Sequence, residues 1–303
     1  MAAQSRVALL FRSLSVFTKR FGLYNTRKAR PYLNEREPDM SDTRKDYLDD
    51  LFGLAGKTAV VVGGTGVLCG AMARGLWRAG CRVVLAGRDA AKAEAHRAAW
   101  EAPQEQVRFC ATEATTKASL VALADQAEDW FGGVDIWING AGINSATPYL
   151  DIAEEEFDRI LSVNLKSVHL GCQVAGGRWM EQGRRGSLIN ISSMSAIRPL
   201  SRVFTYSVTK AGIWNLTQNL AREWAPHAIR VNALCPGFFP AEQNRKVLDP
   251  GRIAAIMRQT PMDRFGEAEE LVGATLLLAS EKAGSFITGA NLAVDGGFSV
   301  TSI

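Results

Sequence analysis

The stretch TAVVVGGTGVLCG, residues 58–70, decides the fold that this sequence predicts. Residues 58–62 are apolar and mostly β-branched, a composition typical of a buried strand. Gly63, Gly64 and Gly66 follow, and a helix is expected over residues 71–79. Glycines between a first strand and a first helix let main-chain N–H groups approach a phosphate at the positive end of the helix dipole. The stretch therefore predicts a dinucleotide-binding turn, with an ordinary tight turn as the alternative.

The sequence downstream repeats the alternation of strand and helix. Strands are expected at residues 82–86, 107–111, 134–138 and 187–191, and helices at residues 90–100, 120–131 and 157–169. Strands that are apolar along their whole length and alternate with helices are typical of a parallel sheet covered on both faces. We therefore predict an α/β fold over residues 54–303: a single-domain, doubly wound parallel sheet, Rossmann-like, with helices on both faces.

Residues 1–53 are predicted to be a basic N-terminal extension, poorly ordered or used for targeting. Residues 1–39 contain eight Lys and Arg and three Asp and Glu, a charge of +5, so the rest of the chain carries −1 of the total of +4. A body without excess positive charge is not expected to bind nucleic acid. Residues 1–34 lack acidic residues and fit an extension with no role in the fold (Met40 being an alternative start), a mitochondrial transit peptide, or a basic surface helix. We expect a cytoplasmic protein, or a mitochondrial one if these residues are a transit peptide.

The remaining composition excludes several classes of protein. The longest uncharged stretch, residues 58–73, is rich in glycine and has 16 residues, fewer than the ~20 apolar residues of a spanning helix. The five cysteines form no CxxC pair and their number is odd, which argues against a disulfide framework and a zinc site. No metal is expected.

Tyr206 and Lys210 are the candidate acid–base pair. They lie four residues apart near the start of a predicted helix, which puts the phenol and the ammonium group on one face. A nearby cation lowers the pKa of a tyrosine from about 10 toward the range in which it transfers protons. Ser193 follows the strand expected at residues 187–191 and can hydrogen-bond a substrate oxygen. Asn164, polar within an apolar helix, can bind a water that relays protons to Lys210, or can be a satisfied core amide.

The end of the second strand favours NADP over NAD as the cofactor. NAD-binding proteins usually place an acidic residue there, which accepts hydrogen bonds from the ribose hydroxyls. This chain has Gly87, which offers no acceptor, and then Arg88, whose guanidinium can bind a 2′-phosphate. The alternative is a solvated arginine at the start of a helix.

From about Leu54 to Phe298 the sequence resembles the short-chain dehydrogenase/reductase family. The matching motifs occur in the family's order: the glycine turn, Asn139-Gly140-Ala141-Gly142, Asn164, Ser193, Tyr206 with Lys210, Pro236-Gly237 and Val294-Asp295-Gly296-Gly297. The resemblance implies an NAD(P)-dependent oxidoreductase, expected as a homotetramer, in which hydride passes directly between nicotinamide and a substrate carbon.

The resemblance also implies a role for individual residues. Tyr206 is then the general acid/base, Lys210 binds the nicotinamide ribose and lowers the tyrosine pKa, Ser193 orients the substrate oxygen, and Asn164 supports the proton relay. The cofactor-binding residues that it implies, with Arg88 added, are Gly63, Gly64, Thr65, Gly66, Val67, Leu68, Arg88, Glu113, Asn139, Ala141, Gly142, Tyr206, Lys210, Pro236 and Gly237.

The glycine turn departs from the family's common TGxxxGxG pattern. Val62 stands in place of the threonine, Val67 in place of the middle glycine, and Cys69 in place of the last; Gly66 and Gly70 are each one residue away. Glu113 replaces the usual aspartate after the third strand. These differences concern the affinity for the cofactor rather than the fold.

Residues 236–245, PGFFPAEQNR, point to the substrate. This stretch and the turn GGTGVL resemble short-chain enzymes called D-mannonate oxidoreductase, or fructuronate reductase. Arg245 can pair with a sugar-acid carboxylate, and the hydroxyl-binding candidates are Ser195, Gln243 and Asn244. Arg198 and Arg202 are rival carboxylate partners. The alternatives are a reductase of 3-oxoacyl thioesters or other ketones, and a catalytically silent cofactor-binding scaffold.

Overall fold

One parallel sheet organises the chain. The computed structural model describes residues 44–239 and 249–301, and residues 45–303 form one compact unit. The sheet has seven strands in the order β3-β2-β1-β4-β5-β6-β7, all paired in parallel. They are β1 Thr58–Val62, β2 Arg82–Gly87, β3 Val107–Ala111, β4 Ile136–Asn139, β5 Gly186–Ile191, β6 Ile229–Pro236 and β7 Asn291–Val294. The predicted doubly wound sheet is confirmed.

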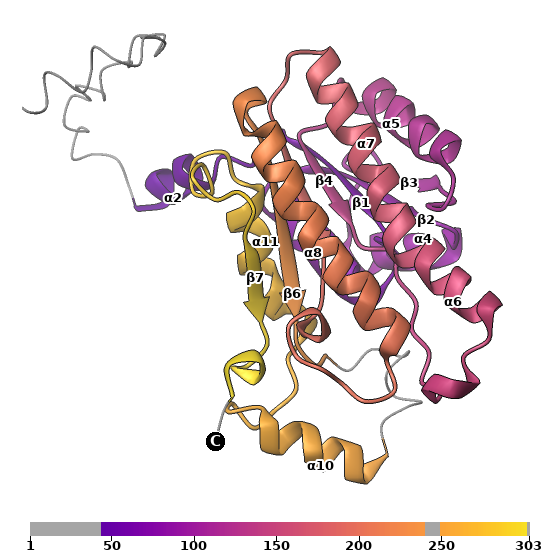
Figure 1. Ribbon diagram of the computed structural model, residues 1–303. Coiled ribbons are helices and arrows are strands. Elements are labelled where there is room, and N and C mark those ends of the chain that lie inside the picture. Colours follow the sequence, from indigo (N-terminus) through magenta and orange to yellow (C-terminus); the bar gives the residue numbers. More distant parts are fainter. Residues whose placement is uncertain (1–43, 240–248, 302–303) are drawn as a thin grey trace, which may run out of the picture. The chain divides into compact units, whose positions relative to one another are not determined.

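Helices cover both faces of this sheet (Figure 1). One face carries α3 (Val67–Arg78), α4 (Ala90–Trp100) and α11 (Leu271–Ala279). The other carries α5 (Lys117–Phe131), α7 (Ser167–Glu181) and α8 (Phe204–Trp224). The side chains of β1 alternate between these faces: Ala59 and Val61 belong to the first core, Val60 and Val62 to the second. Burial on both faces explains why the strand is apolar throughout.

Several boundaries differ from those expected. Helix α3 begins at Val67, earlier than residue 71, because the extended Gly66 ends the turn and the helix follows at once. The helix expected over residues 157–169 is α6 (Glu154–Leu161) joined to α7 by a π-helical segment, Ser162–Lys166. The remaining helices are α2 (Arg44–Phe52) and α10 (Pro250–Gln259). No helix among the described residues is long and apolar enough to cross a membrane.

The strand register aligns the carboxyl ends of the central strands. Val62 of β1 lies opposite Ala86 of β2 and Asn139 of β4, and Asn139 lies opposite Asn190 of β5. The chain winds outward from β1 toward β3 and then returns to β4, so the strand order reverses between β1 and β4. Ligands of open α/β sheets bind at the carboxyl ends beside this switch point. The glycine turn after β1 lies there.

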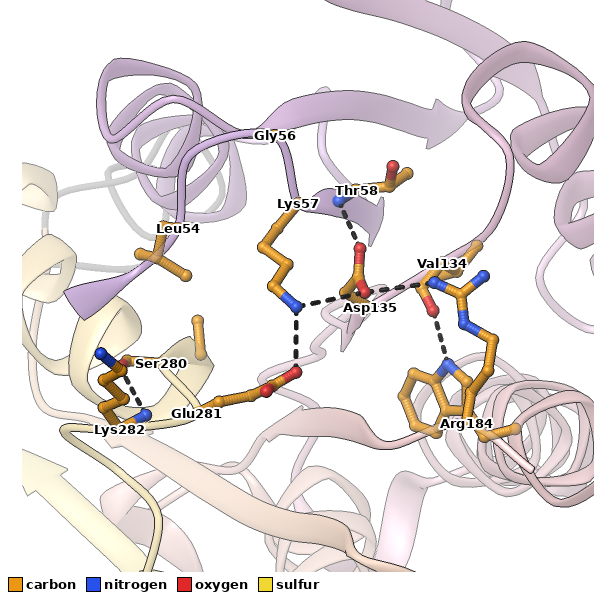
Figure 2. Close-up of polar contacts among 12 residues, drawn as sticks. Leu54, Gly56, Lys57, Thr58, Val134, Asp135, Arg184, Ser280, Glu281 and Lys282 are labelled. Atoms are coloured by element: carbon orange, nitrogen blue, oxygen red, sulfur yellow. Dashed lines mark hydrogen bonds and ion pairs between the residues drawn. The ribbon is translucent and has the colours of Figure 1, made fainter. Parts of the chain in front are cut away.

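The opposite, amino ends of the strands are tied by a charge cluster (Figure 2). Asp135 accepts a hydrogen bond from the Thr58 amide at 2.8 Å and pairs with Arg184 at 3.2 Å and with Lys57 at 3.7 Å. Lys57 also pairs with Glu281 at 3.0 Å. These contacts join the start of β1 to the segments before β4, before β5 and after α11, so this end of the sheet has a structural role.

Helix α2 is attached to the same region. The carbonyl oxygen of Leu51 accepts hydrogen bonds from the Ser280 hydroxyl at 3.1 Å and the Ala283 amide at 3.2 Å, and Asp50 pairs with Lys282. The compact unit accordingly starts at Lys45, before the boundary at Leu54 expected from the sequence. Residues 1–43 lie outside the described residues, and with them the targeting interpretation of the leader.

We predict that deletion of residues 1–39 leaves stability unchanged and that deletion of residues 1–52 lowers it. The longer deletion removes the partner of Ser280 and Ala283, and two neutral hydrogen bonds contribute about 1–3 kcal/mol to the free energy of unfolding. Thermal unfolding of both variants and the full chain measures the difference as a fall of several degrees in Tm. Equal Tm values for the two deletions would show that α2 adds nothing to the fold.

Candidate active site

The turn after β1 is built from residues without room for side chains. Gly63 has φ of +81°, and a Cβ there would lie 2.9 Å from the main-chain nitrogen of Ala141. A Cβ on Gly64 would lie 2.8 Å from the carbonyl oxygen of Val61. The turn therefore keeps its path only with glycine at both positions.

The amino end of α3 can hold a phosphate. Its N-cap, Gly66, is extended, and no side chain caps the first turn. Uncapped N–H groups at the positive end of a helix form an anion site. Val67 and Leu68 begin the first turn of α3, and they offer main-chain N–H groups to an anion but no charged side chain. The residues present therefore fit the pyrophosphate of a dinucleotide, despite the departures from TGxxxGxG.

Cys69 fills the place that a glycine occupies in the common pattern. Its sulfur lies 3.8 Å from the carbonyl oxygen of Gly140, and a Cβ on Gly140 would approach that sulfur to 2.2 Å. The thiol is buried, and burial raises its pKa to about 11. The sulfur thus packs the turn after β1 against the end of β4 as a neutral side chain.

Tyr206, Lys210 and Ser193 come together at the carboxyl end of β5. Lys210 donates a hydrogen bond to the carbonyl oxygen of Ile191 at 2.7 Å, and its nitrogen lies 5.4 Å from the centre of the Tyr206 ring. Ser193 is nearly buried and accepts a hydrogen bond from the Ser195 amide at 3.2 Å. The predicted constellation is assembled by α8 and the end of β5, which brings Ser193 to a tyrosine 13 positions further along the chain.

The electrostatics of this pair differ from the expectation. Burial raises the pKa of Tyr206 above 10, and the side-chain hydrogen bond with Ser193 opposes the rise. Burial lowers the pKa of Lys210 to about 8, while the Cys69 and Cys235 thiols act in the opposite direction. The sequence predicted that Lys210 lowers the tyrosine pKa. In this geometry burial is the largest cause of the shift, and the pKa of Tyr206 is raised instead.

Asn164 is a fully buried anchor. Its Oδ1 accepts from the Ile143 amide at 2.8 Å, and its Nδ2 donates to the Ile143 carbonyl at 2.9 Å and to the Thr209 hydroxyl at 3.2 Å. Both hydrogens of the Asn164 side-chain amide are used, so Asn164 could hold a relay water only by accepting a hydrogen bond from it. The relay stays a prediction. Thr209 and Ile143, separated from Asn164 in the chain by 45 and 21 residues, are partners that no sequence pattern indicated.

Arg88 and Glu113 lie together at the adenosine side of the switch point. The side-chain and main-chain hydrogen bonds from Thr115 hold the pKa of Glu113 below its ordinary value, and the charge of Arg88 adds to this effect. The Glu113 carboxylate is thus occupied by Thr115. A Cβ on Gly87 would lie 2.9 Å from the Thr65 hydroxyl. Gly87 and Thr65 therefore lie against each other, and Arg88 follows Gly87 in the chain.

The other predicted cofactor residues divide into two groups. Gly142 faces the catalytic centre, since a Cβ there would lie 3.6 Å from Asn164 Oδ1 and 3.7 Å from Lys210 Nζ. Ala141 contacts Gly63, as described above. Asn139 is different: its side chain accepts from Trp137 at 2.8 Å and donates to Asn190 at 2.9 Å inside the core. Any contact of Asn139 with a cofactor must come from its main chain.

Pro236 and Gly237 end β6 beside β7. The Gly237 amide donates to the Val294 carbonyl at 2.9 Å, and a Cβ on Gly237 would lie 2.6 Å from the Asp295 main chain. Glycine is thus required where the two strands leave the sheet. The segment that follows, toward the predicted substrate residues Gln243, Asn244 and Arg245, lies outside the described residues from 240 to 248.

Among the predicted substrate-binding residues that the structure describes, one arginine already hydrogen-bonds another part of the protein. Ser195 is buried, and its hydroxyl has no partner within the described part of the chain. Arg198 donates to the carbonyl oxygens of Ser299 at 2.7 Å and Thr301 at 3.3 Å. Arg198 thus fastens the C-terminal segment and is a poor carboxylate partner, whereas Arg202 is exposed.

Comparison with known proteins agrees with this geometry. Residues 67–299 match the family described as enoyl-(acyl carrier protein) reductase, within the short-chain dehydrogenases/reductases. The chain belongs to the short-chain dehydrogenase/reductase family. It is an NAD(P)-dependent oxidoreductase that acts on CH–OH groups.

Three relatives illustrate the range within the family. The uncharacterized oxidoreductase UxuB of Bacillus subtilis is 38% identical over 81% of this chain and 95% of its own. The 3beta-hydroxysteroid dehydrogenase 1 of Eggerthella lenta is 39% identical over 82% and 95%. A crystal structure of a gluconate 5-dehydrogenase from Burkholderia cenocepacia, in complex with NADP and tartrate, has a TM-score of 0.78 and 30% identity over 84% of this chain and 100% of its own. The homotetramer stays a prediction of the family resemblance.

The arrangement fits the proton path that the family resemblance implies, and the roles of the individual residues on that path are predictions. A bound nicotinamide supplies or accepts the hydride. On this predicted path Tyr206 would donate its proton to the developing alkoxide in the reductive direction and accept it in the oxidative direction. Ser193, whose side chain hydrogen-bonds Tyr206, would orient the same oxygen. The Lys210 ammonium group, 5.4 Å from the centre of the Tyr206 ring, would favour the phenolate once the proton has left.

We predict that Tyr206→Phe lowers kcat by about 10²–10⁴-fold and changes the Kd for the cofactor only a few-fold. The phenol hydroxyl takes part in proton transfer, whereas the ring provides the packing. Stopped-flow kinetics and a cofactor titration measure the two quantities. Tyr149→Phe is the matched control, because Tyr149 is 67% exposed and contacts Phe204. Wild-type kcat in Tyr206→Phe would refute the proton path.

We predict opposite pH dependences for the two directions. The raised pKa of Tyr206 keeps the phenol protonated near neutral pH, as reduction requires, so oxidation accelerates as the pH rises. Above about pH 8 Lys210 loses its charge, so binding of the cofactor weakens. Cofactor titrations of Tyr206→Phe across this range isolate the lysine, because the variant has no phenol to titrate. A cofactor Kd that does not change with pH would contradict the assignment to Lys210.

Proposed function

We propose that this enzyme uses NADPH to reduce the ketone of a sugar acid to the corresponding aldonate, with fructuronate as the first candidate. The observation that supports it most is the similarity, over 84% of this chain, to a gluconate 5-dehydrogenase whose structure contains NADP and tartrate, a small polyhydroxy acid. The PGFFPAEQNR stretch points in the same direction through its resemblance to fructuronate reductases.

The adenosine side of the site supports NADPH. Position 87 has no carboxylate to repel a 2′-phosphate, and the exposed Arg88 stands next to it. Thr65 lies against Gly87. A guanidinium and a hydroxyl are suitable donors to a phosphate.

A steroid is the second candidate substrate. One relative, 39% identical, is a 3beta-hydroxysteroid dehydrogenase. Beside Ser193 the structure has an apolar cluster of Met194, Cys235 and Phe298, packed with Leu200 and Phe238. These side chains are buried or partly buried next to Ser193 and do not select between a steroid and a sugar acid, so the choice rests on the measurement described next.

We predict the highest kcat/KM for the two keto sugar acids among five ketones supplied with NADPH. The panel contains fructuronate with 5-keto-D-gluconate, the neutral ketose fructose, a 3-oxosteroid and a 3-oxoacyl thioester. A preference for the steroid or the thioester would replace the proposed substrate class and leave the family assignment intact. Absence of activity on all of them would refute the proposal.

Variants of two arginines locate the substrate carboxylate. Arg245→Gln should raise KM about ten- to a hundredfold for the acid and leave fructose unchanged, because only the acid loses a charge-assisted contact. Arg258→Gln is the control, since Arg258 is exposed on α10. An equal effect of Arg245→Gln on both substrates would place the carboxylate elsewhere.

Arg88→Ala should raise KM for NADPH about ten- to a hundredfold and leave KM for NADH nearly unchanged, because a charge-assisted contact with the 2′-phosphate is lost. Lys92→Ala provides the control, because Lys92 is an exposed cation in the first turn of α4 and lies outside the glycine turn. Equal kcat/KM values for NADPH and NADH in the unmodified enzyme would refute the cofactor preference.

A further inference from the structure

His96 of α4 contacts the turn that binds the cofactor. Its Nε2 lies 3.3 Å from the carbonyl oxygen of Thr65, in the middle of the glycine turn. A carbonyl can only accept, so Nε2 carries the hydrogen and donates it. The imidazole is half-buried, and no part of the mechanism above uses it.

The position of the imidazole depends on Gly70. A Cβ on Gly70 would lie 2.9 Å from Nε2 and 3.2 Å from Cε1 of His96. The imidazole therefore occupies the space that a side chain at position 70 would need. The family's last glycine is displaced here from position 69 to position 70, and this displacement makes room for the ring.

A column of aromatic rings holds the imidazole in place. His96 stacks on Trp100 with ring centres 5.3 Å apart, and Trp100 stacks on Trp77 at 6.4 Å. The Trp77 indole donates to the Gln106 side chain at 2.8 Å. The column runs between α3 and α4, so the donor to Thr65 is fixed by two helices rather than by a loop.

We propose that His96 is a positioning residue for cofactor binding, which fixes the phosphate-binding turn through its hydrogen bond to the Thr65 carbonyl. The peptide of Thr65 and Gly66 precedes the first turn of α3, whose free N–H groups meet the pyrophosphate. When the Thr65 carbonyl is held toward α4, the turn has less conformational freedom before the cofactor binds. It therefore loses less entropy on binding. The inference concerns the dinucleotide and holds for any substrate.

Three variants at position 96 test the hydrogen bond. His96→Ala should raise the Kd for NADPH about two- to tenfold, as expected for one neutral hydrogen bond. His96→Gln should restore the affinity, because its amide nitrogen can take the place of Nε2, whereas the shorter His96→Asn should not. All three lose the ring stacking, so a difference between Gln and Asn reports the donor alone. Direct titration without substrate keeps the result separate from the identity of the ketone.

Two further measurements distinguish positioning from general destabilisation. At saturating NADPH kcat should stay within about twofold of wild type, and the Ki for adenosine, which has neither the pyrophosphate nor the 2′-phosphate, should not change. Gly70→Ala should weaken NADPH binding when His96 is present and have no effect in the His96→Ala background. The proposal is overturned if His96→Ala leaves the NADPH Kd unchanged, if Gln and Asn behave alike, or if adenosine binding is affected equally.

Discussion

The active site depends on a close approach between two segments of the main chain, at the point of the sheet where the strand order reverses. The turn after β1 contacts the chain after β4 with Gly63 against Ala141, leaving no space for a Cβ. The Cys69 sulfur contacts Gly140 from the other side. This approach sets the distance between the phosphate-binding turn and the segment that leads through Gly142 and Ile143 to Asn164. It therefore fixes the cofactor side of the site relative to the catalytic side.

The two ends of the sheet differ in whether their charged side chains form ion pairs. At the amino ends, Lys57, Asp135, Arg184 and Glu281 form mutual ion pairs, so charge is compensated there. At the carboxyl ends, Lys210 is buried, and within the described residues it bonds a carbonyl rather than a carboxylate. A buried cation without a counter-charge is costly, and this cost appears as a pKa lowered to about 8. The Lys210 ammonium group lies at the end of the sheet where the family resemblance predicts that it contacts the cofactor.

The sequence was informative wherever local patterns decide structure. Apolar runs and glycines predicted β1, β3 and α4 with their observed bounds, because each lies between clear turn residues. The spacing of Tyr206 and Lys210 predicted their shared helix face. The π-helical segment at residues 162–166 was not predictable, since it arises where Asn164 binds Ile143 and Thr209, contacts that only the folded chain brings together. The pKa of Tyr206 was misjudged for a similar reason, because burial cannot be read from a spacing of four residues.

Three asparagines show how the register of the sheet assigns function to identical side chains. Asn139 pairs with Val62, whose side chain belongs to the core under α5, α7 and α8, so the Asn139 amide points into that core. Gly171 of α7 leaves room for it, since a Cβ there would lie 2.1 Å from Asn139 Oδ1. Asn190, opposite Asn139, completes the network by donating to Thr217 at 3.0 Å. Asn164 comes from a helix instead and reaches the loop beside the catalytic centre. A motif residue at a strand end can thus stand at the expected sequence position and still have its side chain in the core, where it supports the site by packing and not by contact. The alternation of side chains along the strand decides which face of the sheet each one meets.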